Sequence, residues 1–249
     1  MLQALLWAAA GTGFTFAMTA LGAAAVFFLA GEFHPRFQRA LLGFAAGVMT
    51  AASVWSLLLP AIDRTEALGS FPRWLPASAG LLLGVVFLAA LDAALPRLRR
   101  NSSPANNAQT LLMTAITLHN VPEGMAVGLA FALAASGESF AAAAALALGI
   151  GIQNFPEGAA ISLPLRQHGR FYAFRTGMLS GIVEPVFGIL VVLAAGWAEP
   201  LMPWLLSFSA GAMLYVVVEE LIPQAHSRAG THGFVAGFLI MMVLDTALG

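Results

Sequence analysis

The sequence predicts an all-α integral membrane protein with eight transmembrane helices. Hydrophobic residues make up 59% of the 249 residues and charged residues only 9%, whereas soluble domains carry about 25% charged residues. So few charges cannot cover a surface that faces water. Eight apolar stretches approach or exceed the roughly 20 residues that cross a bilayer core. They are residues 4–30, 39–61, 74–95, 110–134, 140–164, 171–196, 202–222 and 233–248.

The composition also limits the chemistry of the chain. Cysteine is absent, so disulfides and thiolate metal ligands are excluded. The net charge is −1 and no basic block occurs, so nucleic acid is not an expected partner. The first apolar run is too long for the hydrophobic region of a signal peptide and is expected to be a retained span. Residues 1–249 are predicted to form a single transmembrane domain.

Arginine supplies every basic residue of the chain, and its distribution predicts the orientation. Nine of the eleven arginines lie in or beside the connections that follow odd-numbered spans, and only Arg64 and Arg73 follow even-numbered ones. Basic residues concentrate in cytoplasmic loops. The odd-numbered connections are therefore predicted to be cytoplasmic, which places both termini outside.

An internal repeat supports the count of eight spans. Residues 41–49 (LLGFAAGVM) and 205–213 (LLSFSAGAM) are identical at six of nine positions. The second and seventh spans would cross in opposite directions, so we predict an inverted repeat that relates spans 1–3 to spans 6–8 around a central pair, spans 4 and 5. Transporters commonly use this architecture, with binding sites near the membrane midplane. Chance similarity between helices rich in small residues is the alternative.

Two six-residue motifs place polar groups in mid-span: HNVPEG at 119–124 and QNFPEG at 153–158. The first and fifth residues of each motif lie on one helix face, because residues four apart are neighbours on a helix. These pairs are His119 with Glu123 and Gln153 with Glu157. The second residues, Asn120 and Asn154, are rotated by about 100° and are placed to serve a neighbouring site. Polar groups inside a membrane are costly and usually functional.

Each motif also contains a proline and ends on a glycine. Pro122 and Pro156 each leave a carbonyl one turn earlier without its helical donor. Such a carbonyl must be satisfied by a neighbour, water or an ion. Gly124 and Gly158 allow another backbone to approach closely.

The polar groups at this depth form a possible metal-ligand set. They are Met49, His119, Asn120, Glu123, Gln153, Asn154, Glu157 and Glu184. Three carboxylates in hydrocarbon repel one another unless a cation or protons compensate them. Mixed imidazole, carboxylate and amide ligands suit Zn²⁺ and its first-row neighbours without selecting one strongly. The alternative is a pair of proline-kinked helices joined only by hydrogen bonds.

With these motifs the chain resembles the ZIP (Zrt/Irt-like protein) family of metal transporters, and most of all its bacterial GufA-type branch. GIVEPVFG at 181–188 and GVMTAASVWSLLLP at 47–60 add to the likeness. The resemblance implies uptake across the bacterial cytoplasmic (inner) membrane, a homodimer, and a bundle with spans 4 and 5 that slides like an elevator against a scaffold with spans 2 and 7.

The resemblance also implies a two-metal site. The first position would use Met49, His119, Glu123, Gln153 and Glu157, and the second Asn120, Glu123, Asn154, Glu157 and Glu184. Asn154 departs from the family, since some members have aspartate there. The second position is therefore expected to be weaker than the first.

Further polar residues lie toward the ends of the spans. Ser56 and Asp63 follow Met49 by seven and fourteen residues, so they share its helix face and are candidates for an outer entrance. Asp92 and Asp245 are expected to be interfacial anchors. By resemblance to the family, Glu219, Glu220 and His226 are candidates for the exit route on the cytoplasmic side.

The predicted function is transport of divalent transition-metal ions toward the cytoplasm, zinc first, with iron, manganese or cadmium as further candidates. The metal is the substrate, and no cofactor is expected. An intramembrane metal-dependent enzyme is the alternative, but it needs activated water at an open metal position and no H-E-x-x-H motif occurs. A carrier of small organic solutes would need a solute-binding group such as a mid-span arginine, which is absent. The expected partners are metal ions, the lipid bilayer and a second copy of the chain.

Overall fold

The described part of the chain is helical and contains no strand. The computed structural model describes residues 1–29, 34–69, 71–98, 104–197 and 199–248, and within these ranges the side chains of 95–98, 104–119, 197 and 199 lie outside the description. The predicted all-helical class is confirmed. The helices are α1 (Leu2–Ala23), α2 (Ala25–Phe28), α3 (Pro35–Ala52), α4 (Leu59–Leu68), α5 (Trp74–Leu98), α6 (Pro104–Ala135), α7 (Phe140–Leu165), α8 (Arg170–Ser180), α9 (Val183–Trp197), α10 (Met202–Val216), α11 (Ile222–Ala225) and α12 (Arg228–Leu248).

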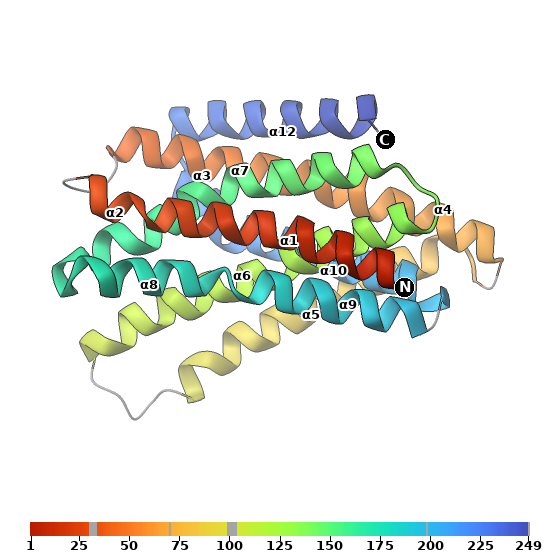
Figure 1. The fold of residues 1–249 in the computed structure, drawn as a ribbon, viewed down its shortest axis with the longest axis horizontal. Coiled ribbons are helices and arrows are strands. Elements are labelled where there is room, and N and C mark those ends of the chain that lie inside the picture. The colour runs from red at the N-terminus through yellow and green to blue at the C-terminus, as the bar shows by residue number, and fades with distance from the viewer. Residues whose placement is uncertain (30–33, 70, 99–103, 198, 249) are drawn as a thin grey trace.

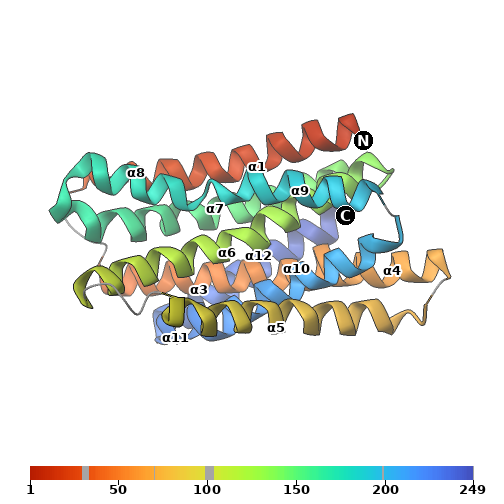
Figure 2. The ribbon, with the colours of Figure 1, turned by 90° about the horizontal axis from the view of Figure 1, so that it is seen from below.

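The helices pack as two groups that lie side by side (Figures 1 and 2). In the first group α1 runs along α7 and α6 runs along α9, with α8 against α7 and α1. In the second group α12 runs along α3 and α10 runs along α5. The two groups meet mainly where α10 contacts α6 and where α7 contacts α3 and α12. Both polar motifs therefore belong to the first group, close to its boundary with the second.

Glycines bring the helices of the second group into backbone contact. A Cβ atom added to Gly43 or Gly47 of α3 would overlap backbone atoms of α12, and one added to Gly233 or Gly237 of α12 would overlap those of α3. Small residues at such positions let membrane helices approach closely, which maximises van der Waals contact. The glycines of span 2 are therefore used for packing inside one chain.

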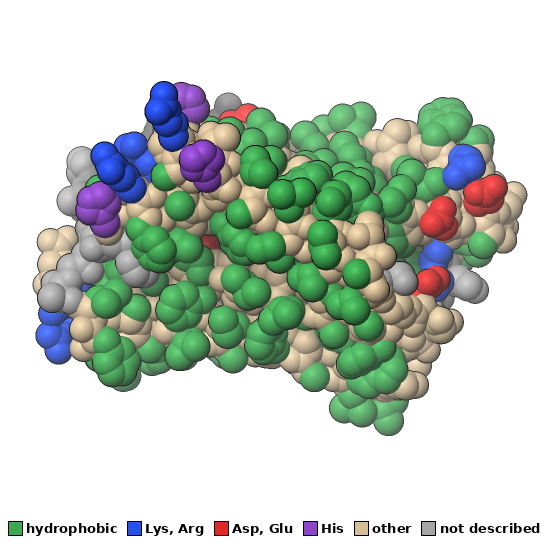
Figure 3. Space-filling view, turned by 90° about the horizontal axis from the view of Figure 1, so that it is seen from above, with side chains coloured by type: hydrophobic (Ala, Val, Ile, Leu, Met, Phe, Trp, Pro, Cys, Tyr) green, Lys and Arg blue, Asp and Glu red, His purple; other side chains and the backbone are tan. Residues whose placement is uncertain are grey.

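The surface has the character of a membrane protein. Many large hydrophobic side chains are exposed, and Figure 3 shows them over the middle of the molecule. Six helical stretches among the described residues are long and apolar enough to cross a membrane, and the described part of α6, Asn120–Ala135, is a shorter apolar helix. α7 is 26 residues long, but the polar motif lowers its hydropathy and it is not among the six. Six is fewer than the predicted eight, so the number of crossings stays a prediction.

The ends of the molecule differ in charge. In Figure 3 histidines and most of the visible arginines gather at one end, while acidic side chains gather at the other. Both termini lie toward the acidic end (Figure 1). This arrangement has the asymmetry that the arginine distribution predicts.

Both copies of the predicted repeat lead into a π-helical segment. Ser53–Leu58 joins α3 to α4, and Val217–Leu221 joins α10 to α11. Each begins four residues after the last methionine of its copy, Met49 or Met213. The two helices also run in opposite directions (Figure 2). π-helical turns are rare and often lie at functional sites.

Candidate metal site

The two motifs and two further helices meet in the interior of the molecule. α6 contributes Asn120 and Glu123, α7 contributes Gln153, Asn154 and Glu157, α9 contributes Glu184, and α3 contributes Met49. All of these except Glu157 are at most 1% exposed, and Glu157 is partly exposed. His119 belongs to α6, but its side chain lies outside the described residues.

An amide and a carboxylate join the two motifs. The Gln153 Nε2 donates a hydrogen bond of 2.7 Å to the Glu123 Oε1. Both side chains are fully buried, and a hydrogen bond to a charged acceptor at this length is among the stronger ones in proteins. The bond holds α6 against α7 at the depth of the motifs.

A second amide and carboxylate join α7 to α9. The Asn154 Nδ2 donates to the Glu184 Oε2 at 2.9 Å and contacts the Thr15 carbonyl of α1 at 3.4 Å. The other oxygen of Glu184, Oε1, accepts from the Thr19 hydroxyl at 3.2 Å. Both carboxylate oxygens of Glu184 therefore have hydrogen-bond donors, and one of the donors comes from α1.

Four buried oxygens of this cluster accept no hydrogen bond from the described part of the chain. They are Asn120 Oδ1, Glu123 Oε2, Gln153 Oε1 and Asn154 Oδ1. Nearly all buried polar atoms in proteins have a partner, so four together call for an explanation. Carboxylate and amide oxygens are cation ligands, and a bound cation would satisfy them.

The carboxylates of the cluster also repel one another. Glu123 interacts electrostatically with Glu157 and Glu184, and Glu184 interacts with Glu157. Nevertheless, no group of three or more His, Cys, Asp or Glu side chains lies close enough to hold a metal ion in the part of the chain whose side chains are described. The structure thus brings the ligands together as two amide–carboxylate pairs and leaves the complete eight-residue set a prediction.

The motif glycines have the predicted role. A Cβ on Gly124 would overlap the backbone of Glu184, and a Cβ on Gly158 would overlap the Thr19 carbonyl. The two glycines therefore let α9 and α1 approach the motifs. This expectation is confirmed.

The motif prolines lie inside helices that continue past them. α6 extends to Ala135 beyond Pro122, and α7 extends to Leu165 beyond Pro156. The Ser209 hydroxyl of α10 donates to the Pro122 carbonyl at 2.9 Å. This bond ties the first motif to the second group of helices.

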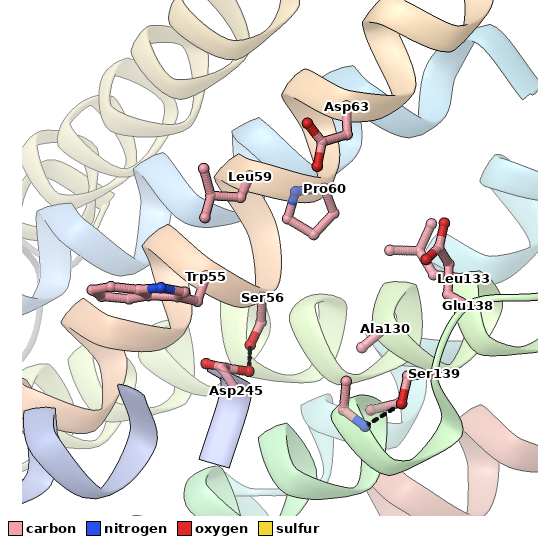
Figure 4. A pocket seen from close by; sticks show the side chains of 12 residues that line it. Trp55, Ser56, Leu59, Pro60, Asp63, Ala130, Leu133, Glu138, Ser139 and Asp245 are labelled. Carbon is pink, nitrogen blue, oxygen red and sulfur yellow. Dashed lines mark hydrogen bonds between the residues drawn. The ribbon is translucent and has the colours of Figure 1, made fainter. Parts of the chain in front are cut away.

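Ser56 and Asp63 line one cavity of about 220 Å³ (Figure 4), as expected for residues on one helix face. Asp245 of α12 lines it too, and its Oδ1 accepts from the Ser56 hydroxyl at 2.7 Å. Asp245 is only 8% exposed, so its interpretation as an interfacial anchor is wrong. α12 packs so closely on α3 that it carries this residue inward.

The candidate exit residues lie toward the other end of the second group. Glu219 and Glu220 belong to the π-helical segment Val217–Leu221, and His226 follows α11. Glu219 and His226 are exposed, and Glu220 is partly exposed. His226 lines a separate cavity with residues of α3, α11 and α12.

Sequence reasoning missed three residues that contact the cluster or the cavity. Thr19 donates to Glu184, the Ser180 carbonyl accepts from the Asn120 Nδ2 at 3.0 Å, and Asp245 bonds Ser56. A threonine in an apolar helix and a backbone carbonyl carry no signal in a single sequence. Asp245 did carry a signal in the sequence, since a carboxylate inside an apolar stretch is costly and calls for a partner.

Taken together, the apolar belt and the buried polar cluster define a multi-pass membrane protein with carboxylate and amide side chains in its interior. Comparison with known proteins gives the family. A family model described as "ZIP Zinc transporter" matches residues 97–245, and the chain belongs to the ZIP family.

Relatives match nearly the whole chain. Zinc transporter ZIP11 of Homo sapiens is 36% identical over 99% of this chain and 97% of its own length. Zinc transporter GufA of Myxococcus xanthus is 37% identical over 93% and 94%, and zinc transporter ZIPB of Bordetella bronchiseptica is 39% identical over 99% and 81%. The chain is therefore a transporter rather than an enzyme.

Proposed function

We propose that this chain carries divalent transition-metal ions, zinc above all, toward the cytoplasm across a bacterial cytoplasmic membrane. The observation that carries the proposal is a set of four amide and carboxylate oxygens that are buried in a ZIP-family protein and accept no hydrogen bond from the described residues. The names of its relatives support zinc as the substrate. Iron, manganese and cadmium are further candidates, since the ligand types do not select strongly among these metals.

The metal is proposed to bind at two positions between the motifs. Met49, His119, Glu123, Gln153 and Glu157 form the first, and Asn120, Glu123, Asn154, Glu157 and Glu184 form the second. The first position is supported by the unpartnered oxygens of Glu123 and Gln153, and the second by those of Asn120 and Asn154. Glu123 and Glu157 are shared, so the two ions would lie side by side.

The transport cycle is proposed to be an elevator-like motion of one group of helices against the other. The separation of the helices into two packed groups supports this proposal. All the described ligands except Met49 belong to the first group, so the site would travel with it. The opposite directions of α3 and α10 and their matching π-helical segments support the inverted repeat, with eight crossings and both termini outside. A homodimer is proposed from the family resemblance.

The route to and from the site is proposed to pass between the two groups. Ser56 and Asp63 would receive the ion at the outer end, where their cavity lies. Glu219, Glu220 and His226 would release it toward the cytoplasm. The entrance candidates lie in or just before α4 and the exit candidates lie on either side of α11, and these two helices are at opposite ends of the molecule (Figure 2).

Reconstitution of the whole chain into liposomes with a metal-sensitive dye inside tests the function. Zn²⁺ added outside is expected to reach the dye faster than in protein-free liposomes, and Fe²⁺, Mn²⁺ and Cd²⁺ test the selectivity. No flux of any of the four ions at several pH values would refute the proposal.

Replacing Asn154 with aspartate is expected to strengthen the second metal position. The new carboxylate would face Glu184 at the place of a 2.9 Å hydrogen bond, and two carboxylates this close repel unless a proton or a cation lies between them. Isothermal titration calorimetry with Zn²⁺ should show tighter binding of the second ion than in the wild type. Unchanged binding would mean that position 154 is not a ligand.

A further inference from the structure

Three threonines on one face of α1 point into the protein. Thr12, Thr15 and Thr19 are at most 1% exposed, although α1 is otherwise apolar. Thr12 donates to the Ala8 carbonyl at 2.7 Å and Thr15 to the Thr12 carbonyl at 3.0 Å. Such bonds to the preceding turn are the ordinary way in which a buried threonine hydroxyl is satisfied.

Thr19 differs from Thr12 because its hydroxyl also reaches Glu184, a ligand of the proposed metal site, and the Thr15 side chain interacts with Glu184 as well. Its hydroxyl lies 3.3 Å from the Thr15 carbonyl and 3.2 Å from the Glu184 Oε1. A hydroxyl has one proton, and hydrogen bonds to an ionised acceptor are about twice as strong as neutral ones. An ionised Glu184 therefore competes well for the proton of Thr19.

The surroundings of Thr19 leave it little freedom. A Cβ on Gly181 would lie 3.0 Å from its side-chain atoms, and a Cβ on Gly158 would overlap its carbonyl oxygen. The same turn of α1 presents the Thr15 carbonyl to the Asn154 amide. One turn of α1 thus contacts both members of the Asn154–Glu184 pair.

We propose that Thr19 is a positioning residue for the second metal position, an inference that rests on the proposed function. Its hydroxyl holds the Glu184 Oε1, so that the Oε2 stays directed toward Asn154 and is the oxygen that binds the ion. When the ion arrives, the Asn154 amide turns to present its oxygen in place of its N–H. Thr19 keeps its hydrogen bond to the Glu184 Oε1 throughout, since hydrogen-bond partners of metal-ligating carboxylates fix the orientation of those carboxylates.

The proposal makes α1 part of the binding machinery. Loss of a hydrogen bond to a metal-ligating side chain typically lowers metal affinity by about 10- to 100-fold. Thr19→Val should therefore weaken binding of the second ion by that factor. The first ion should bind as in the wild type, since Thr19 donates to Glu184, which is not a ligand of the first position. Thr19→Ser keeps the hydroxyl and should restore wild-type binding.

The experiment is a calorimetric titration of the purified whole chain in detergent with Zn²⁺, in parallel with the liposome assay. Thr12→Val is the matched control, because Thr12 is equally buried in the same helix but its hydroxyl bonds only within α1. Gel filtration and thermal unfolding verify that each variant is folded. Should Thr19→Val not fold, Thr19→Ala replaces it, since the smaller side chain fits the same space.

Each outcome bears on a separate claim. A second binding event weakened in Thr19→Val but not in Thr19→Ser or Thr12→Val supports the inference. Two wild-type binding events that Thr19→Val leaves unchanged overturn it, as does a single wild-type event, while transport would still stand. A wild-type protein that neither binds nor transports Zn²⁺ would instead refute the proposed function itself.

Discussion

Replacing Glu123 with glutamine is expected to reduce zinc transport by at least about 100-fold while the protein stays folded. Glu123 is fully buried, accepts a hydrogen bond from Gln153 on its Oε1, and has an Oε2 with no hydrogen-bond donor in the described part of the chain. Like Glu157, Glu123 belongs to both proposed metal positions. Its hydrogen bond to Gln153 also holds it against the second motif. Since outer-shell partners alone change metal affinity by 10- to 100-fold, loss of a shared ligand should exceed that range.

The glutamine variant separates a binding role from a structural one. The glutamine side chain has nearly the shape of glutamate, and burying a neutral amide costs less than burying a charge. The free energy of unfolding should therefore fall by no more than about 1–2 kcal/mol relative to the wild type. Glu66→Gln is the control, because Glu66 is exposed and forms an ion pair with the exposed Arg73 at 3.4 Å. If zinc flux in liposomes with Glu123→Gln stays within a factor of two of the wild type, Glu123 is not a ligand of the transported ion.

Replacing Gly158 with alanine is expected to destabilise the protein and to impair transport as well. The added methyl group would overlap the Thr19 carbonyl and lie 2.9 Å from the Ala23 amide nitrogen. Both are backbone atoms of α1, so no side chain can turn aside to make room. Overpacking of this kind costs about 1–3 kcal/mol, and it would push α1 away from the Asn154–Glu184 pair.

Gly13→Ala is the matched control, because it makes the same chemical change in α1 where a Cβ would meet nothing within 4 Å. Alanine is the better helix former by roughly 0.5–1 kcal/mol, so this control should unfold at the same temperature as the wild type or higher. For a chain of this size each kcal/mol shifts the melting temperature by about 2–4 °C. Equal melting temperatures for Gly158→Ala and Gly13→Ala would contradict the close contact of α1 with α7.

The fold class followed from the sequence because it depends on summed properties. An apolar composition with few charges requires a lipid-facing surface, and long apolar runs in a membrane form helices since every backbone polar group must be satisfied internally. The different directions in which Gln153 and Asn154 face, toward Glu123 and toward Glu184, agree with their spacing on the helix. The eight crossings, the inverted repeat and the two metal positions remain predictions of that reasoning.

The partners of those residues did not follow from spacing. The i,i+4 rule pairs residues within a helix, whereas Gln153 bonds Glu123 of another helix and Asn154 bonds Glu184 of a third. Spacing along one helix contains no information on which neighbouring helix faces it or at what height. Chain separations of 30 residues in both bonds show that packing makes these choices.

Thr19 and Asp245 show most clearly which contacts cannot be predicted from the sequence alone. In sequence, Thr19 is one hydroxyl in an apolar helix, and Asp245 is a carboxylate near the end of the last span. Close packing of α1 on Gly158 brings Thr19 to Glu184, and close packing of α12 on α3 brings Asp245 to Ser56. Composition and periodicity establish a helical membrane protein and predict the polar side chains buried within it. Which helices surround that chemistry is decided by backbone contacts at glycines, since only side-chain volume in three dimensions determines how closely two helices approach.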